Sequence, residues 1–344
     1  MQINEISIGS ESATEYLLRA PSPASMPAKE SAVQKPAVRQ KSLKLEDFAT
    51  LYSHEECIEV EGIKYPFVLI NQFDELRTQS LHLSPKPYSV PARFKRFAEG
   101  FLKAKLSLST FNGGCVGIAE IQVEGVTTKI NGRRVGYFDF MATNLAQDAY
   151  LAQFDNSFGA EETLRGYEIR EGRQIDLKES NLTNMVGVGF MILNKSSNRL
   201  IFAQRRKDLV VEGGTISIPG GTPVWNNNWK PPREIYFPGY LQAHFAEELE
   251  EELCLAPEEF KFRRGLWLKD FTRAPDLIVY LETNVPLNEI ANRCAQSETA
   301  LKEHETLYGV PFNERTLQGF VSVDSKYVLN ALSVVAFKLA LQAF

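Results

Sequence analysis

The apolar positions of this chain are most regular after residue 184, where short hydrophobic runs alternate with polar turns. The runs MVGVGFMILN, RLIFAQRR, GGTISIPGG, LWLKDFTR and PDLIVYLETN contain the branched and aromatic side chains typical of β-strands. Apolar residues at helical spacing predict a helix over about 240–254 and a closing helix after residue 324. PLNEIANRCAQ is interpreted as a helix or a turn. This order of elements predicts a sheet with helices packed on it.

Residues 46–180 follow a different pattern. YPFVLI at 65–70 predicts a buried strand, and the spacing of Phe94, Phe97 and Phe101 in ARFKRFAEGFLKAKL predicts a helix. Residues 116–123 predict another strand, and Asn131-Gly132 is typical of a hairpin turn between two extended runs. We predict a smaller α+β region here, whose role the sequence does not indicate.

Residues 1–45 are rich in Ser, Pro, Ala, Gln and Lys, as in APSPASMPAKESAVQKPAVRQKS. Such a composition buries too little apolar surface to offset the entropy of ordering, so we predict a disordered tail. The tail could be a linker, a docking tail or a secretion leader. The start MQINEISIGSESATEY lacks both a basic region and an apolar core, and this favours a cytoplasmic protein over a secreted effector that uses the tail as its leader. No apolar run approaches the length needed to span a membrane.

The charge and the cysteines exclude some classes of protein. The net charge of −5 argues against nucleic acid as the main partner. The four cysteines are scattered without C-x-x-C spacing, which favours reduced thiols over zinc ligands or a disulfide framework. Cys115 follows Gly113-Gly114 and could be a nucleophile. No histidine partner is indicated for it, so we interpret it as a buried structural thiol.

The segment AEELEEEL, residues 246–253, concentrates five glutamates in one predicted helix. On a helical wheel Phe245, Ala246, Leu249 and Leu253 share the face that packs on the sheet. The glutamates then divide between two flanks. Three of them converge on one flank, and the other two lie on the opposite flank, free for solvent; the converging set is Glu248, Glu251 and Glu252, and the solvated pair is Glu247 and Glu250. Three convergent carboxylates suit a hard divalent cation, and a plain solvated helix face is the alternative.

This arrangement resembles the Nudix hydrolases, whose signature opens at a glycine and ends in Arg-Glu-apolar-x-Glu-Glu-x-Gly-apolar. Gly221, after Gly220 in IPGG, matches the opening glycine, and EELEEELCL at 247–255 matches the end. The likeness covers roughly 184–320. It departs from the signature at Glu247, where the arginine is expected, and at Cys254, where the last glycine is expected. The stretch between the glycine and the helix is also about a dozen residues longer than the signature allows, with VWNNNWKPPREIY as the apparent insertion.

The resemblance implies a Nudix-type α/β/α sandwich with a mixed sheet at 181–344. It implies that this domain hydrolyses a diphosphate linkage in a nucleoside diphosphate joined to another group. It implies Mg²⁺ or Mn²⁺ bound by Glu248, Glu251 and Glu252. It also implies that a later acidic residue, Glu305 or its neighbour Glu303, adds a ligand or general base. His304, between these two, should point away from both if the segment is extended.

Further candidates surround this core of the site. Arg205 and Arg206 end a strand and could pair with phosphate, with surface solvation as the alternative. Trp225 and Trp229 in the long loop could stack on a nucleobase, although we favour anchoring of the loop. His244 lies one turn before Glu248, where a His–Glu pair is favoured over a metal ligand.

Two hypotheses remain. In the first, the protein is a metal-dependent hydrolase of a small nucleotide-like substrate. In the second, the altered signature marks a Nudix-fold module that binds or regulates a nucleotide or protein partner without catalysis. The sequence leaves the oligomeric state open, a homodimer included.

Overall fold

The computed structural model describes residues 1–18, 37–52, 56–106, 112–207, 214–270, 274–322 and 329–343. A ten-stranded sheet forms its centre, and its strands run in the order β1, β2, β18, β12, β11, β17, β16, β5, with β13 on β12 and β14 on β11. The strand β11 pairs in parallel with β17, whereas the other neighbours in this sheet are antiparallel. The predicted mixed sheet is therefore confirmed.

The strands of this large sheet are β1 (Gln2–Ile8), β2 (Glu11–Leu17), β5 (Val68–Phe73), β11 (Gly187–Asn194), β12 (Arg199–Arg205), β13 (Ile216–Ser217), β14 (Gly220–Gly221), β16 (Phe260–Lys269), β17 (Pro275–Thr283) and β18 (His304–Pro311). The helices around it are α5 (Phe237–Leu253), α6 (Leu287–Cys294), α7 (Glu298–Glu303), α8 (Glu314–Val321) and α9 (Ala331–Ala343).

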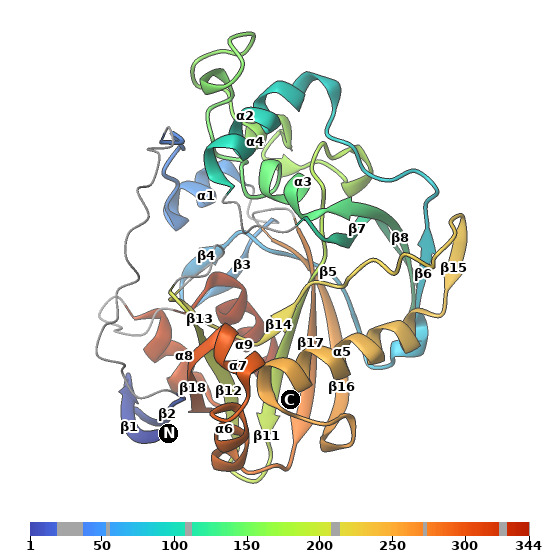
Figure 1. Cartoon of the computed structure of the whole chain (residues 1–344). Helices are drawn as coiled ribbons and strands as arrows, with labels where there is room; N and C mark the ends of the chain where they lie inside the picture. Colours follow the sequence, from blue (N-terminus) through green and yellow to red (C-terminus); the bar gives the residue numbers. More distant parts are fainter. Residues whose placement is uncertain are drawn as a thin grey trace.

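Helices cover both faces of the large sheet because its central strands are apolar on both sides. In β11, Phe190 and Ile192 belong to a core shared with α5, α6 and α7, while Met191 belongs to a second core shared with α8 and α9. A strand buried on both faces needs such a continuous apolar run. The result is three layers, helices, sheet and helices, as Figure 1 shows.

The region between residues 46 and 180 contributes three of the four strands of a second sheet, together with short helices. Its strands run in the order β15 (Arg233–Ile235), β6 (Gln79–Leu83), β8 (Thr127–Gly136) and β7 (Gly114–Glu124). Its remaining elements are α1 (Leu45–Leu51), β3 (Ile58–Val60), β4 (Ile63–Tyr65), α2 (Lys95–Lys105), α3 (Tyr137–Ala142), α4 (Leu164–Tyr167), β9 (Ile169–Arg170) and β10 (Arg173–Gln174).

The two sheets exchange strands. The edge strand β5 comes from the earlier region but completes the large sheet by pairing with β16. In return β15, from the predicted insertion, completes the small sheet by pairing with β6. Helix α5 lies between them, and its apolar side shares one core with Leu81 of β6 and Phe190 of β11. In Figure 1, α5 extends from the large sheet toward β15 and β6.

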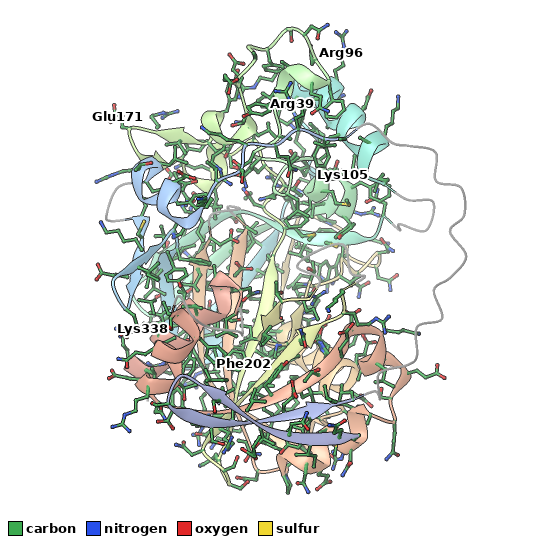
Figure 2. All side chains as sticks on the ribbon, turned by 90° about the vertical axis from the view of Figure 1, so that its left-hand side faces the viewer. Arg39, Arg96, Lys105, Glu171, Phe202 and Lys338 are labelled. Carbon is green, nitrogen blue, oxygen red and sulfur yellow. The ribbon has the colours of Figure 1, made fainter. Side chains whose placement is uncertain are left out.

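The prediction of a disordered tail over 1–45 is wrong for its first part. Residues 2–17 form the hairpin β1–β2, and β2 pairs with β18, with Tyr16 opposite Leu307. Figure 2 shows this hairpin across the lower part of the molecule, below Phe202. The hairpin is ordered because Ile8, Ala13 and Tyr16 are buried against the sheet and its helices. Helix α1 begins inside the same predicted tail at Leu45, and residues 19–36 lie outside the described residues.

The predicted hairpin turn at Asn131-Gly132 is also wrong. Both residues lie inside β8, and the β7–β8 connection is at Gly125, which has φ +61°. Gly132 is needed in the strand for another reason. A Cβ there would lie 2.7 Å from Cδ1 of Leu81 on the neighbouring strand, so the glycine makes room for that side chain.

The hairpin turn approaches α8 closely enough to give a test of this docking. A Cβ on Gly319 of α8 would lie 2.7 Å from the carbonyl carbon of Ile8. An alanine in a helix ordinarily adds stability. Here we expect Gly319→Ala to lower the free energy of unfolding by about 1–3 kcal/mol through overpacking, measured by urea denaturation.

The matched control is Gly166→Ala in α4, where nothing lies within 4 Å of the added Cβ. That variant should stay within about 0.5 kcal/mol of the wild type. Equal stability of Gly319→Ala and the wild type would show that the hairpin does not pack on α8 in solution.

Candidate functional site

Helix α5 carries the acidic segment and presents it as the wheel predicts. Pro238 lies at the start of the helix, where its missing N–H costs nothing. The helix ends at Cys254, whose φ of +53° is left-handed. Phe245, Leu249 and Leu253 are buried against the sheet, and Ala246 beside them is partly buried. The apolar face is therefore confirmed.

The consecutive glycines of β14 meet two of the glutamates. The backbone N–H of Gly220 donates to Oε2 of Glu252 at 2.8 Å. A Cβ on Gly221 would lie 2.0 Å from Oε2 of Glu248. A side chain at position 221 would therefore displace the carboxylate of Glu248 from this place.

Burial and mutual repulsion act on Glu248. Burial raises the pKa of Glu248 to about 8, and the charges of Glu252, Glu251, Glu247 and Glu303 add to this rise. Each of these carboxylates disfavours a further negative charge at the same place. Glu248 therefore keeps its proton to a higher pH than usual, and a cation bound here would take the place of that proton.

Two buried histidines lie against the same pair of carboxylates. Nδ1 of His244 is 3.6 Å from Oε1 of Glu248, which confirms the expected His–Glu contact, and burial lowers the pKa of His244 to about 4. Nε2 of His304 is 3.4 Å from Oε2 of Glu252. The sequence predicted no role for His304, and its position at the α7–β18 junction could be found only from the fold.

The two predicted arginines make different kinds of contact with Glu303. Arg205 pairs with Glu303 at 3.5 Å between Nη2 and Oε2, while its buried Nε has no hydrogen bond among the described residues. Arg206 contacts the same segment through its backbone, because its N–H donates to the carbonyl of Glu303. Arg205 is therefore paired with Glu303, whose charge in turn raises the pKa of Glu248.

Of the two late acidic residues, Glu303 is the one that acts on Glu248, since its charge raises the pKa of Glu248. Glu305 instead accepts a hydrogen bond from the backbone of Lys207 at 3.4 Å, and its own carbonyl accepts one from Leu18. The contacts thus favour Glu303 over Glu305 as the added carboxylate.

The donor chemistry of the site fits a hard cation, although its side chains are not gathered into a complete set. Glu248 and Glu252 meet at the glycines, while Glu251 is exposed on the next part of the helix. Across the residues that the structure describes, no three His, Cys, Asp or Glu side chains are close enough together to hold a metal ion. Carboxylate oxygens are nevertheless the donors that Mg²⁺ and Mn²⁺ prefer.

The long loop is anchored by its aromatic residues, as favoured above. Trp225 is buried and packs edge-on against Trp229 at 5.0 Å, and Trp229 packs in the same way on Tyr240 of α5. The backbone of Trp225 donates to the carbonyl of Gly114 in β7. Cys115 beside it is a buried free thiol whose pKa is raised by burial. The loop therefore ties α5 to the small sheet.

Comparison with known proteins gives distant structural similarity only. No family model matches the chain, and no curated protein matches it significantly. Three solved structures are similar. DR0079 from Deinococcus radiodurans is 10% identical with a TM-score of 0.31, over 45% of this chain and 82% of that chain. A MutT Nudix hydrolase from Burkholderia pseudomallei is 18% identical with a TM-score of 0.28, over 45% of this chain and 95% of that one.

The third is a bifunctional NMN adenylyltransferase/ADP ribose pyrophosphatase from Francisella tularensis, complexed with AMP and a Mn ion. It is 11% identical with a TM-score of 0.26, over 46% of this chain and 41% of that one. MutT or Nudix proteins recur among further similar structures, and this is the family that the sequence resembles. At these identities and scores, what the site does rests on its own residues. None of the described helices is long and apolar enough to cross a membrane.

The raised pKa of Glu248 predicts how stability depends on pH in the metal-free protein. The folded protein binds this proton more tightly than the unfolded chain does, so wild-type stability falls as the pH rises from about 4.5 to 8. Glu248→Gln removes that loss. We expect the variant to be more stable than the wild type by about 2–4 kcal/mol at pH 8, and by much less at pH 5.

Denaturant titrations at both pH values measure this difference. Glu250→Gln is the control, because Glu250 is exposed on the other flank of the helix, and it should have no effect at either pH. A Glu248→Gln variant that is less stable at pH 8 would contradict the uncompensated charge described for this site.

Proposed function

We propose that this protein is a divalent-metal-dependent hydrolase that cleaves a diphosphate linkage in a nucleoside diphosphate joined to another group. The observation that carries this proposal is the meeting of Glu248 and Glu252 with the Gly220–Gly221 turn, in a place of uncompensated negative charge. The likeness of residues 184–320 to the Nudix signature supports it. The Mn ion named with the Francisella tularensis protein agrees with the same choice of cation.

In this proposal Glu248, Glu251 and Glu252 hold Mg²⁺ or Mn²⁺. Such a cation would neutralise charge on the diphosphate and lower the pKa of a bound water. Gly221 leaves room for the carboxylate of Glu248, since a Cβ there would lie 2.0 Å from Oε2 of Glu248. The exposed Glu251 would complete the set from the next part of the helix.

Arg205 and Glu303 act on the substrate in this proposal. The guanidinium of Arg205 is largely buried and has an unused N–H, so it suits a phosphate oxygen. Glu303 holds that guanidinium and also faces Glu248, which suits a carboxylate that accepts a proton from water. Arg206, Gly220 and Glu305 then frame the site through their contacts with Glu303, Glu252 and Lys207.

A binding or regulatory module without catalysis is the second candidate, and two observations favour it. Glu247 stands where the signature has arginine, so an ion pair that would orient the glutamates is missing. Glu251 is exposed and does not join Glu248 and Glu252 in a compact ligand group. A site of this kind could still bind a nucleotide through a weakly held cation.

A cleavage assay separates the two candidates. We expect the wild type to hydrolyse at least one member of a panel of nucleoside diphosphate derivatives with Mg²⁺ or Mn²⁺. The double variant Glu251→Gln with Glu252→Gln should lower kcat/KM by about 100-fold or more, because the cation supplies several kcal/mol of transition-state stabilisation.

Glu250→Gln, on the opposite flank, should keep wild-type activity. Activity that survives in the double variant would sink the assigned site. Absence of cleavage by the wild type, together with tight binding of a nucleotide measured by calorimetry, would establish the binding module instead.

A further inference from the structure

Two histidines, which we call the histidine pair, lie beneath the acidic flank of α5. They come from different elements, His244 from α5 itself and His304 from the first position of β18. Both are at least nine-tenths buried, with 5% and 1% of their surface exposed. Such buried imidazoles normally satisfy their nitrogens with hydrogen bonds. Here Nε2 of His244 and both ring nitrogens of His304 have none among the described residues.

His304 contacts Glu252 on one particular oxygen. Its Nε2 is 3.4 Å from Oε2 of Glu252, the same oxygen that accepts the N–H of Gly220 at 2.8 Å. The two polar contacts found for this carboxylate therefore fall on Oε2. The other oxygen, Oε1, is left for a further ligand.

His244 makes the corresponding contact with Glu248. Its Nδ1 is 3.6 Å from Oε1 of Glu248, one turn further along the helix. Both oxygens of Glu248 lie toward Gly221, where an added Cβ would be 2.0 Å from Oε2 and 2.4 Å from Oε1. Each carboxylate thus has one oxygen beside an imidazole and one oxygen free of it.

In the described part of the chain, no Lys or Arg side chain pairs with the carboxylate of Glu248 or Glu252. The residue before Glu248 is Glu247, which is exposed and whose negative charge raises the pKa of Glu248. The nearest arginine of the site, Arg205, is paired with Glu303. Among the described residues, the side chains that form pairs with Glu248 and Glu252 are the two imidazoles.

We propose that His304 and His244 are positioning residues, which hold Glu252 and Glu248 by one oxygen each and direct the other oxygen toward the divalent cation. This inference rests on the proposed function. At 3.4 and 3.6 Å these contacts are not hydrogen bonds in this structure, so the proposal requires Nε2–H of His304 and Nδ1–H of His244 to move closer to the carboxylates and donate when the cation is bound. Hydrogen-bond partners behind metal-binding carboxylates orient them in this way, and their loss typically costs about 10–100-fold in metal affinity.

Amide substitutions test the proposal because they can mimic one ring nitrogen at a time. Glutamine places its NH₂ near the position of Nε2, and asparagine places its NH₂ near that of Nδ1. We therefore expect His304→Gln and His244→Asn to keep Mn²⁺ affinity within about threefold of the wild type. His304→Asn and His244→Gln, with the amide at the wrong position, should lose about 10–100-fold. Free Mn²⁺ measured by electron paramagnetic resonance gives the affinity without an activity assay.

Thermal unfolding of the same metal-free variants separates positioning from packing, because the two amides at one site differ little in polarity. His82→Ala, on β6 and paired with Glu234, is the matched control and should bind Mn²⁺ like the wild type. Equal Mn²⁺ affinity of the matched and mismatched amides would overturn the inference and leave the proposed function standing. A wild type that binds no Mn²⁺ would overturn both.

Discussion

The structure depends on the close approach of helix α5 to the two glycines of β14. Glu252 accepts the N–H of Gly220, and the carboxylate of Glu248 occupies the space that a side chain at Gly221 would need. This approach is costly, since it buries carboxylates that repel one another and raises the pKa of Glu248 to about 8. Apolar packing offsets the cost, because Leu249 and Leu253, on the inner face of the same helix, are fully buried.

The long loop and the exchanged strands keep that approach in place. The pairing of β15 with β6, and the contact of Trp225 with β7, fix the chain just before α5 to the small sheet. Tyr240 on the first turns of α5 packs on Trp229 and donates to the carbonyl of Val224. The position of the acidic flank is therefore set by both sheets. A substitution that shifts the small sheet would also shift the carboxylates of α5.

Much of the fold could be predicted from local pattern, and the failures have physical causes. The apolar runs identified β11, β12, β16, β17 and α5 because each buries a continuous face. The hairpin β1–β2 was missed because composition was averaged over 45 residues, although Ile6, Ile8 and Tyr16 alternate with polar residues around Gly9. The helical wheel found the acidic flank, since its glutamates are local in sequence. His304 could not be placed, because its contact with Glu252 joins residues more than fifty positions apart.

The hairpin β1–β2 pairs with β18, a strand that is synthesised much later. The strands of the large sheet therefore cannot assemble in the order in which they are synthesised. The β1–β2 hairpin is synthesised well before its partner β18, which begins at His304. Contacts between such distant segments form slowly because the entropy of closing a long loop is lost before the contacts stabilise the chain. Until then the hairpin is an isolated pair of strands with an unpaired edge, and such edges attract other chains. Nascent chains of this protein are thus most exposed to aggregation in the interval between the synthesis of β2 and that of β18.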